Sequence, residues 1–321
     1  MKFTVITTFG PSLRNKAKLE ELNALGDIIL RINGAHINPE QVSETVSFIR
    51  DALPKTPIMM DLPGNKVRLQ HLGGEVPITK GEPIEIHGDQ LNYREYAKHL
   101  SVGDHALTHD SKYTLEVTNI DGNTITFIPH QTGTLLPNKG LHVAGANKTL
   151  PFLFDKDKAL IRAAVNTRID ILSLSFVRNA ADIKEAKNVM AEAGSEITIF
   201  SKVETEEAIE NLGEIFYEVD TINVDRGDLS ADIGVLRLPL VQERIIDSAQ
   251  RAGKNVFLAT QFLHNMEEHP VPLIPEIVDL YNTIKRGVSG IQLSEETAVG
   301  RYPIEATKLV FDMHKKSYSS S

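Results

Sequence analysis

Residues 197–204 have the sequence Ile-Thr-Ile-Phe-Ser-Lys-Val-Glu, a short apolar run that ends in a lysine and a glutamate. Such runs of β-branched and aliphatic residues are typical of buried parallel strands. Similar runs recur along the 321-residue chain, and longer helical patterns separate them. The predicted strands comprise residues 3–7, 28–31, 57–61, 169–174, 197–202, 221–224, 256–259 and 290–293. The sequence therefore predicts an α/β protein built from eight βα units.

The segment between the third and fourth predicted strands has a different composition. Glycine, proline and short alternating stretches dominate it, and Asp121-Gly122-Asn123 predicts a hairpin turn. Eight parallel strands with a β insertion after the third predict a TIM (β/α)8 barrel that carries a small β-barrel lid domain. The expected domains are the barrel at 1–69 and 146–316, the β-rich lid at 70–145, and a disordered tail at 317–321.

Single residues mark the expected ends of two helices. Gly26 follows the amphipathic segment 16–24 and suits a helix C-terminal cap, a position that favours the left-handed conformation. Pro39 is expected to open the second helix, because proline is favoured in the first helical turn.

The overall composition excludes several classes of function. The 34 Lys+Arg residues are outnumbered by 43 Asp+Glu, which gives a net charge of −9 and argues against a nucleic-acid partner. The absence of cysteine removes disulfides, thiolate catalysis, cysteine zinc sites and iron–sulfur clusters. The sequence contains no signal-like region or apolar span of bilayer length, so we expect a soluble cytoplasmic protein without a membrane partner.

Polar side chains fall at or just after the ends of the predicted strands, where the catalytic groups of TIM barrels lie. They are Arg31, Asp61, Ser175, Lys202, Glu204, Asp228, Thr260, Ser294 and Glu296.

Among these, Lys202 would lie on an inward-facing strand, where a charge is costly to bury without partners. Glu204 shares its face, and Asp228 lies one strand away at the same end. Two carboxylates in this arrangement suit Mg²⁺ or Mn²⁺. A Schiff-base aldolase would also use a strand-end lysine, so these residues alone leave phosphoryl transfer and carbon–carbon chemistry open.

A series of short motifs resembles the successive signatures of the pyruvate kinase family and occurs in the family's order. The motifs are VITTFGPS (5–12), LRINGAH (30–36), DLPGNKVR (61–68), LSFVR (174–178), KVE (202–204), DRGDL (225–229), ATQ (259–261) and LSEETA (293–298). In the lid, VGD (102–104) and KGL (139–141) resemble the landmarks of the family's β domain.

The resemblance implies phosphoryl transfer between phosphoenolpyruvate and ADP, dependent on Mg²⁺ or Mn²⁺. Lys202 resembles the lysine that contacts the phosphoryl group, and Thr260 resembles the threonine beside the substrate carboxylate and the proton-transfer path. Glu204 and Asp228 resemble the residue pair that holds the divalent cation.

The resemblance also implies contacts to the substrate and the nucleotide. Arg31 and Ser175 resemble phosphate contacts, and Gly227 belongs with Asp228 to the substrate-binding Arg-Gly-Asp segment. The implied nucleotide-side contacts are Arg68, His36 and Lys139, and Asp110 roughly matches a lid aspartate that closes toward the metal.

One departure from the family concerns the monovalent-cation site. Asn33 and Asp61 are retained, but Ala35 and Leu62 replace a serine and a threonine that supply oxygen ligands. Lys66 stands where potassium-dependent members have a glutamate, as in potassium-independent members. We therefore expect that K⁺ is not required.

Other departures lie near the expected substrate pocket. Asp225 occupies a position that is almost always small and apolar, and Glu295 replaces a glycine. Leu273-Ile274 replace Thr-Arg, and Pro63 replaces a lysine on the nucleotide side. An alternative function is therefore a metal-dependent 2-oxo acid lyase, aldolase or decarboxylase that uses a pyruvate enolate. A non-catalytic binding protein would be expected to lose Lys202, Glu204 or Asp228, and all three are present.

The end of the sequence and the barrel surface give two further expectations. The sequence ends just after the eighth predicted helix, so the family's C-terminal domain and its allosteric site are expected to be absent. A homo-oligomer formed through the barrel is a possible assembly.

Overall fold

The computed structural model describes residues 2–109, 112–143, 145–146 and 149–319. The chain divides into two compact units, which we call the barrel unit (Met1–Pro63 and Asp155–Ser321) and the insertion unit (Gly64–Phe154). The insertion unit thus extends beyond the 70–145 expected from composition, at both ends.

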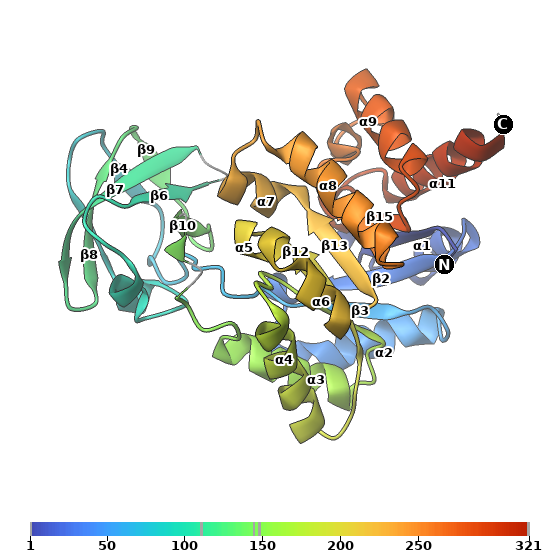
Figure 1. Cartoon of the computed structure of the whole chain (residues 1–321), viewed down its shortest axis with the longest axis horizontal. Helices are drawn as coiled ribbons and strands as arrows, with labels where there is room; N and C mark the ends of the chain where they lie inside the picture. The colour runs from blue at the N-terminus through green and yellow to red at the C-terminus, as the bar shows by residue number, and fades with distance from the viewer. Residues whose placement is uncertain (1, 110–111, 144, 147–148, 320–321) are drawn as a thin grey trace. The chain divides into compact units, whose positions relative to one another are not determined.

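The barrel unit contains a closed parallel barrel, formed within the described residues by eight strands in the order β1-β15-β14-β13-β12-β11-β3-β2 (Figure 1). The strands are β1 (Thr4–Thr8), β2 (Ile28–Asn33), β3 (Ile58–Asp61), β11 (Ile171–Leu174), β12 (Thr198–Val203), β13 (Thr221–Asp225), β14 (Asn255–Ala259) and β15 (Gly290–Leu293). Each corresponds to a predicted strand, with ends that differ by at most two residues. The predicted TIM barrel is confirmed.

Helices connect the strands and cover the barrel (Figure 1). They are α1 (Lys16–Ala24), α2 (Val42–Ala52), α3 (Asp155–Asn166), α4 (Ala180–Glu192), α5 (Glu206–Glu210), α6 (Leu212–Glu218), α7 (Arg226–Ile233), α8 (Leu238–Arg251), α9 (Ile274–Lys285), α10 (Glu295–Ala298) and α11 (Pro303–Ser319). Side-chain caps start several of them: Asn15 accepts a hydrogen bond from Lys18 N, and Thr205 accepts one from Ala208 N. In the described part of the chain, no helix combines the length and apolar character that crossing a bilayer requires.

Two local predictions about helix ends are wrong. Gly26 does not adopt a positive φ, and Leu25 is the C-cap of α1. The glycine is needed for close packing instead, because a Cβ there would lie 2.7 Å from the Phe311 ring. The predicted disorder at 317–321 is also wrong for residues 317–319, which continue α11. Ser317 is buried and its Oγ donates to Met313 O at 2.8 Å; residues 320–321 lie outside the described residues.

The barrel interior changes from apolar to polar along the strands. One buried cluster consists of Ile6, Ile29, Met59, Ile171, Phe200 and Phe257, which come from six of the barrel strands. Because side chains alternate across a strand, the residue two positions further along returns to the same face. On β2, β3 and β12 those residues are Arg31, Asp61 and Lys202, all buried. The alternation therefore places polar groups above an apolar floor, toward the carboxyl ends of the strands.

The insertion unit is built from antiparallel strands. They are β4 (Val76–Ile78), β5 (Ile84–His87), β6 (His105–Thr108), β7 (Tyr113–Asp121), β8 (Thr124–Pro129), β9 (Gly133–Leu135) and β10 (Leu141–Val143). The predicted hairpin is confirmed, because Asp121 pairs with Thr124 and Gly122 has a φ of 56°. Within the described residues, the ladders form a sheet in the order β10-β6-β7-β8-β5 and a separate β4-β9 ribbon, not one closed small barrel. The expected closed β-barrel does not form among these strands, because β4 and β9 pair with each other and not with the edges of the five-stranded sheet.

Candidate active site

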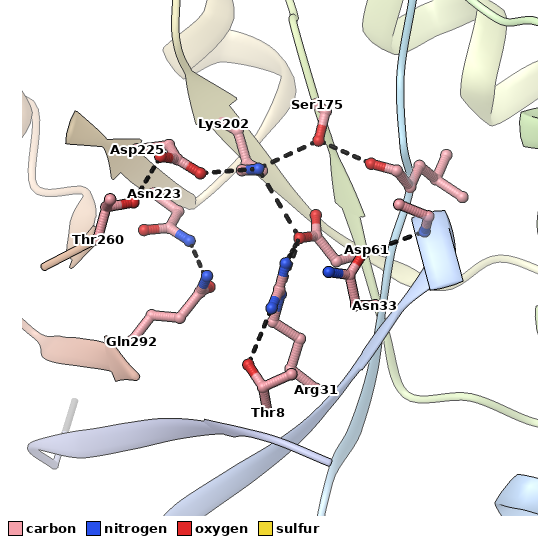
Figure 2. Close-up of polar contacts among 12 residues, drawn as sticks. Thr8, Arg31, Asn33, Asp61, Ser175, Lys202, Asn223, Asp225, Thr260 and Gln292 are labelled. Carbon is pink, nitrogen blue, oxygen red and sulfur yellow. Dashed lines mark hydrogen bonds and ion pairs between the residues drawn. The ribbon is translucent and has the colours of Figure 1, made fainter. Parts of the chain in front are cut away.

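Oxygen atoms surround the ammonium group of Lys202 near the carboxyl end of β12 (Figure 2). Its Nζ lies 2.6 Å from Glu204 Oε1, 3.1 Å from Asp225 Oδ2 and 3.7 Å from Asp61 Oδ2. Nζ also donates a hydrogen bond to Ser175 Oγ at 3.2 Å. Four strand ends therefore converge on one cation.

Burial and charge act in opposite directions on Lys202. Its side chain is 5% exposed, and this burial alone would lower the pKa of the ammonium group. The carboxylates of Asp61, Glu204 and Asp225 outweigh the burial and raise the pKa well above its ordinary value. Burial raises the pKa of Glu204 to about 8, although Lys202 opposes that shift. Each charge thus depends on the other, as expected for a buried ion pair.

A second cation, Arg31, is fixed beside the first. Its Nε and Nη2 donate to Asp61 Oδ2 at 2.8 and 2.5 Å, and its Nη1 donates to Thr8 Oγ1 at 2.8 Å. Thr8 Oγ1 in turn donates to Leu293 O at 2.9 Å, which ties the guanidinium to β15. Asp61 Oδ1 is buried and has no hydrogen-bond partner among the described residues. A buried acceptor of this kind is an expected contact point for a ligand or ion.

Thr260 is held on the opposite side of Lys202 by a short network. Its Oγ1 donates to Asp225 Oδ1 at 2.7 Å, and its carbonyl oxygen accepts from Arg226 Nε and Nη2 at 3.1 and 2.6 Å. Arg226 also stacks on the Phe262 ring at 3.9 Å. Thr260 has a φ of 80°, a strained conformation for a β-branched residue. Such strain is typical of positions that a site holds in place.

The geometry around Thr260 also explains the adjacent glycine. A Cβ at Gly227 would lie 3.1 Å from Thr260 Cγ2, so a larger residue would press on the threonine. Gly227 therefore lies directly beside the network that contains Asp225 and Thr260.

Three carboxylates at this end of the barrel are spaced as ligands for a divalent cation. Glu204, Asp225 and Asp228 each offer an oxygen atom, and these atoms lie within 4.8 Å of one another. Carboxylate oxygens are the donors that Mg²⁺ and Mn²⁺ prefer. The donor set therefore fits a hard cation. Glu296, by contrast, is buried, accepts from Ser294 N at 2.7 Å, and forms a different carboxylate group with Glu267 and Glu295.

The sequence-predicted site residues are distributed over both units. The barrel unit brings together Arg31, Ser175, Lys202, Glu204, Asp225, Gly227, Asp228 and Thr260. His36 ends the turn η2 (Gly34–His36) in the same unit.

The other predicted residues belong to the insertion unit. Arg68 forms a backbone bridge with Gly140, next to Lys139. Lys66 is half-buried, and its Cε would lie 3.0 Å from a Cβ at Gly140, so these three basic residues occupy one region of the unit. Asp110 lies outside the described residues.

Sequence analysis missed a buried amide pair inside the barrel. Asn223 Nδ2 donates to Gln292 Oε1 at 2.8 Å, joining β13 to β15 (Figure 2). It also missed Arg226, which holds the carbonyl of Thr260. For Asn223 and Gln292 the available signal was a polar side chain inside an otherwise apolar strand.

The sequence matches the family described as pyruvate kinase, barrel domain, over residues 1–307. The chain is 29% identical to a pyruvate kinase of Thermococcus litoralis, over 98% of this chain and 69% of that protein. It is 32% identical to a pyruvate kinase of Geobacillus stearothermophilus, over 96% of this chain and 55% of that protein. It is 31% identical to a pyruvate kinase of Thermotoga maritima, over 98% of this chain and 70% of that protein.

This chain therefore spans between about half and 70% of the length of these curated relatives. Both the family match and the similarity to the relatives extend through the insertion as well as the barrel. On this evidence, the chain belongs to the pyruvate kinase family.

Proposed function

We propose that the chain transfers a phosphoryl group between phosphoenolpyruvate and ADP, with Mg²⁺ or Mn²⁺ bound by Glu204 and Asp228. The observation that supports this most directly is the buried Lys202 ammonium beside the group formed by Glu204, Asp225 and Asp228. Positioning and charge stabilisation are the main protein contributions to phosphoryl transfer, and this cluster is suited to supply both.

Each of the chain's own groups has a distinct task in this proposal. Lys202 stabilises charge that spreads over the transferred phosphoryl oxygens, because a cation acts strongly in a water-poor site. Arg31 and Ser175 orient the phosphate, and a guanidinium suits that contact because it can donate two parallel hydrogen bonds. Thr260 lies beside the substrate carboxylate on the path of the proton. The divalent cation, when bound, neutralises charge on the enolate and phosphoryl oxygens.

We further propose that this transfer does not require K⁺. Asn33 Oδ1 accepts a hydrogen bond from Ala35 N at 3.0 Å, which engages one of the retained oxygens. Asp61 Oδ2 is engaged by Arg31, and the side chains of Ala35 and Leu62 contain no oxygen. Lys66 is the proposed source of the missing positive charge. The proposed nucleotide contacts are Arg68, His36 and Lys139.

A second candidate function rests on Asp225. This carboxylate contacts both Lys202 and Thr260, the two donors that an anionic substrate would need. An enzyme that used the enolate of a 2-oxo acid in a lyase, aldolase or decarboxylase reaction could use Asp225 to hold or deprotonate a different substrate.

One experiment separates the two functions. Phosphorus NMR of the protein with Mg²⁺, phosphoenolpyruvate and ADP should show ATP formation, and Lys202→Met should abolish it. Lys184→Met removes a lysine whose side chain is 63% exposed and should leave the rate unchanged. Exchange of pyruvate methyl protons in deuterated water without phosphoryl transfer would instead support the lyase function.

We also propose that the barrel unit forms a homo-oligomer. Large apolar side chains are exposed on it, including Leu240 at 78% and Ile274 at 81%. Contact with a second copy of the chain would remove such side chains from water, which is favourable. Light scattering should give a mass that Leu240→Glu reduces toward that of one chain.

A further inference from the structure

Strands β6, β7 and β8 are neighbours in the sheet of the insertion unit (Figure 1). Two histidines and a glutamate come together there. His105 of β6 is directly opposite Glu116 of β7 in the antiparallel ladder. His130 follows β8, and its backbone N donates to Thr114 O at 2.9 Å. Thr114 lies two residues before Glu116 and therefore on the same face of β7. The register of the antiparallel strands thus brings the three side chains close together.

The side chains also approach one another. His130 Nε2 lies 3.0 Å from Glu116 Oε2, and the rings of His105 and His130 meet edge-on with centroids 5.4 Å apart. One ligand atom from each of the three residues lies within 4.8 Å of the others. The side chains of His130 and Glu116 are 40% and 39% exposed, so a metal ion could reach them from solvent.

The chemistry of this donor set differs from that of the barrel site. Three groups of metal-ligating residues occur in the described part of the chain, and this is the one that contains imidazoles. Hard cations prefer carboxylate oxygens, whereas two imidazoles with one carboxylate are a known ligand set of Zn²⁺. Zinc bonds of 2.0–2.1 Å in a tetrahedron place two ligand atoms about 3.3 Å apart. The distance of 3.0 Å between His130 and Glu116 is close to that value.

We propose that His105, Glu116 and His130 form a Zn²⁺ site on the insertion unit, with water completing the coordination. The ion would link β6, β7 and the residue after β8. Because the ion binds the folded sheet, it should stabilise the insertion unit, and the stabilisation should rise with the logarithm of the Zn²⁺ concentration above the Kd. The site is independent of the proposed phosphoryl transfer.

Calorimetric titration of the whole chain with Zn²⁺ tests this proposal. Excess Mg²⁺ is present in the titration so that the carboxylate group of the barrel is occupied by its preferred cation. We expect one Zn²⁺ per chain at the insertion unit. His105→Gln and His130→Gln should each weaken Zn²⁺ binding by at least about tenfold. Substitution of residues that only support the ligands already weakens metal binding by this amount.

A matched control and a spectroscopic readout complete the test. His87→Gln removes another histidine of the same sheet, whose Nδ1 contacts Thr124 Oγ1 at 2.9 Å, and should bind Zn²⁺ as the native chain does. Substitution by Co²⁺ should produce visible absorption that His105→Gln and His130→Gln abolish. Circular dichroism of the metal-free variants checks that they are folded.

Two results would overturn the zinc site. The first is a native chain that binds no Zn²⁺ when Mg²⁺ is present in excess. The second is Zn²⁺ binding that His105→Gln and His130→Gln leave unchanged. In either case the contact between His130 and Glu116 is an ordinary surface hydrogen bond.

Discussion

Lys202 Nζ lies 3.1 Å from Asp225 Oδ2, while the other oxygen of Asp225 accepts a hydrogen bond from Thr260 Oγ1 at 2.7 Å. One carboxylate therefore engages both donors that the proposed function assigns to the substrate. A bound anion with a phosphate and a carboxylate must compete with Asp225 for Lys202 and Thr260. The Asp225 side chain is 14% exposed, so water screens this competition only partly.

Asp225→Ala should strengthen the binding of phosphoenolpyruvate. Removing the competing carboxylate should lower the KM for phosphoenolpyruvate about tenfold, equivalent to roughly 1.4 kcal/mol. Steady-state kinetics at fixed Mg²⁺ and ADP measure the change. Asp220→Ala is the matched control, because Asp220 pairs with Lys254 at 2.9 Å on the surface and should leave KM unaltered. A KM that stays constant or rises in Asp225→Ala would show that this carboxylate helps to bind the substrate.

Divalent-cation binding should depend on Glu204 and Asp228. Each of Glu204→Gln and Asp228→Asn removes a negative oxygen ligand, so Mn²⁺ binding followed by electron spin resonance should weaken about tenfold or more. Glu295→Gln should leave the titration unchanged, because Glu295 belongs to the separate group with Glu267 and Glu296. Equal Mn²⁺ affinity in the native chain and in both site variants would refute the assigned ligands.

Phosphoryl transfer should proceed without K⁺ and should depend on Lys66. Lys66→Glu replaces an attraction for the phosphoryl oxygens by a repulsion, so kcat/KM for phosphoenolpyruvate should fall about tenfold or more. Added K⁺ should restore little of the activity, because Ala35 and Leu62 still offer no side-chain oxygen. Lys80→Glu, at an exposed lysine of the same unit, should change the rate little. A native enzyme that turns over only with K⁺ would contradict the proposed role of Lys66.

The strands and the convergence of the site were predictable because both depend on short-range patterns. An apolar run followed by a polar residue gives the strand and its end, and parallel strands in a closed barrel bring those ends together. Lys202, Glu204 and Asp228 could therefore be placed near one another from the sequence. The contact of two Arg31 nitrogens with one Asp61 oxygen could not, because it depends on rotamers and on the packing around both side chains.

The histidine cluster of the insertion unit escaped sequence analysis for a different reason. His105, Glu116 and His130 are far apart in the chain, and only the ladder register between β6 and β7 makes two of them neighbours. Serine composition likewise suggested a disordered tail. The structure continues α11 there, where Lys285 Nζ donates to Ser317 O at 3.3 Å and Tyr318 OH donates to Ile284 O at 3.2 Å. Composition does not reveal such tertiary contacts.

Substitution by alanine should have opposite effects on stability at two glycines, Gly26 and Gly213. They differ in the space that a Cβ would find. Gly26→Ala would place a Cβ 2.7 Å from the Phe311 ring, which is 7% exposed and has little room to move, so the free energy of unfolding should fall by about 1–3 kcal/mol. Gly213 lies in α6 without a positive φ, and a Cβ there meets no atom within 4 Å. Gly213→Ala should therefore raise the free energy of unfolding by up to about 1 kcal/mol, because alanine favours a helix more than glycine does. Urea unfolding followed by circular dichroism measures both changes. Equal stability of the two variants would mean that the Phe311 ring moves aside without cost. The close packing would then not be the reason for a glycine at position 26.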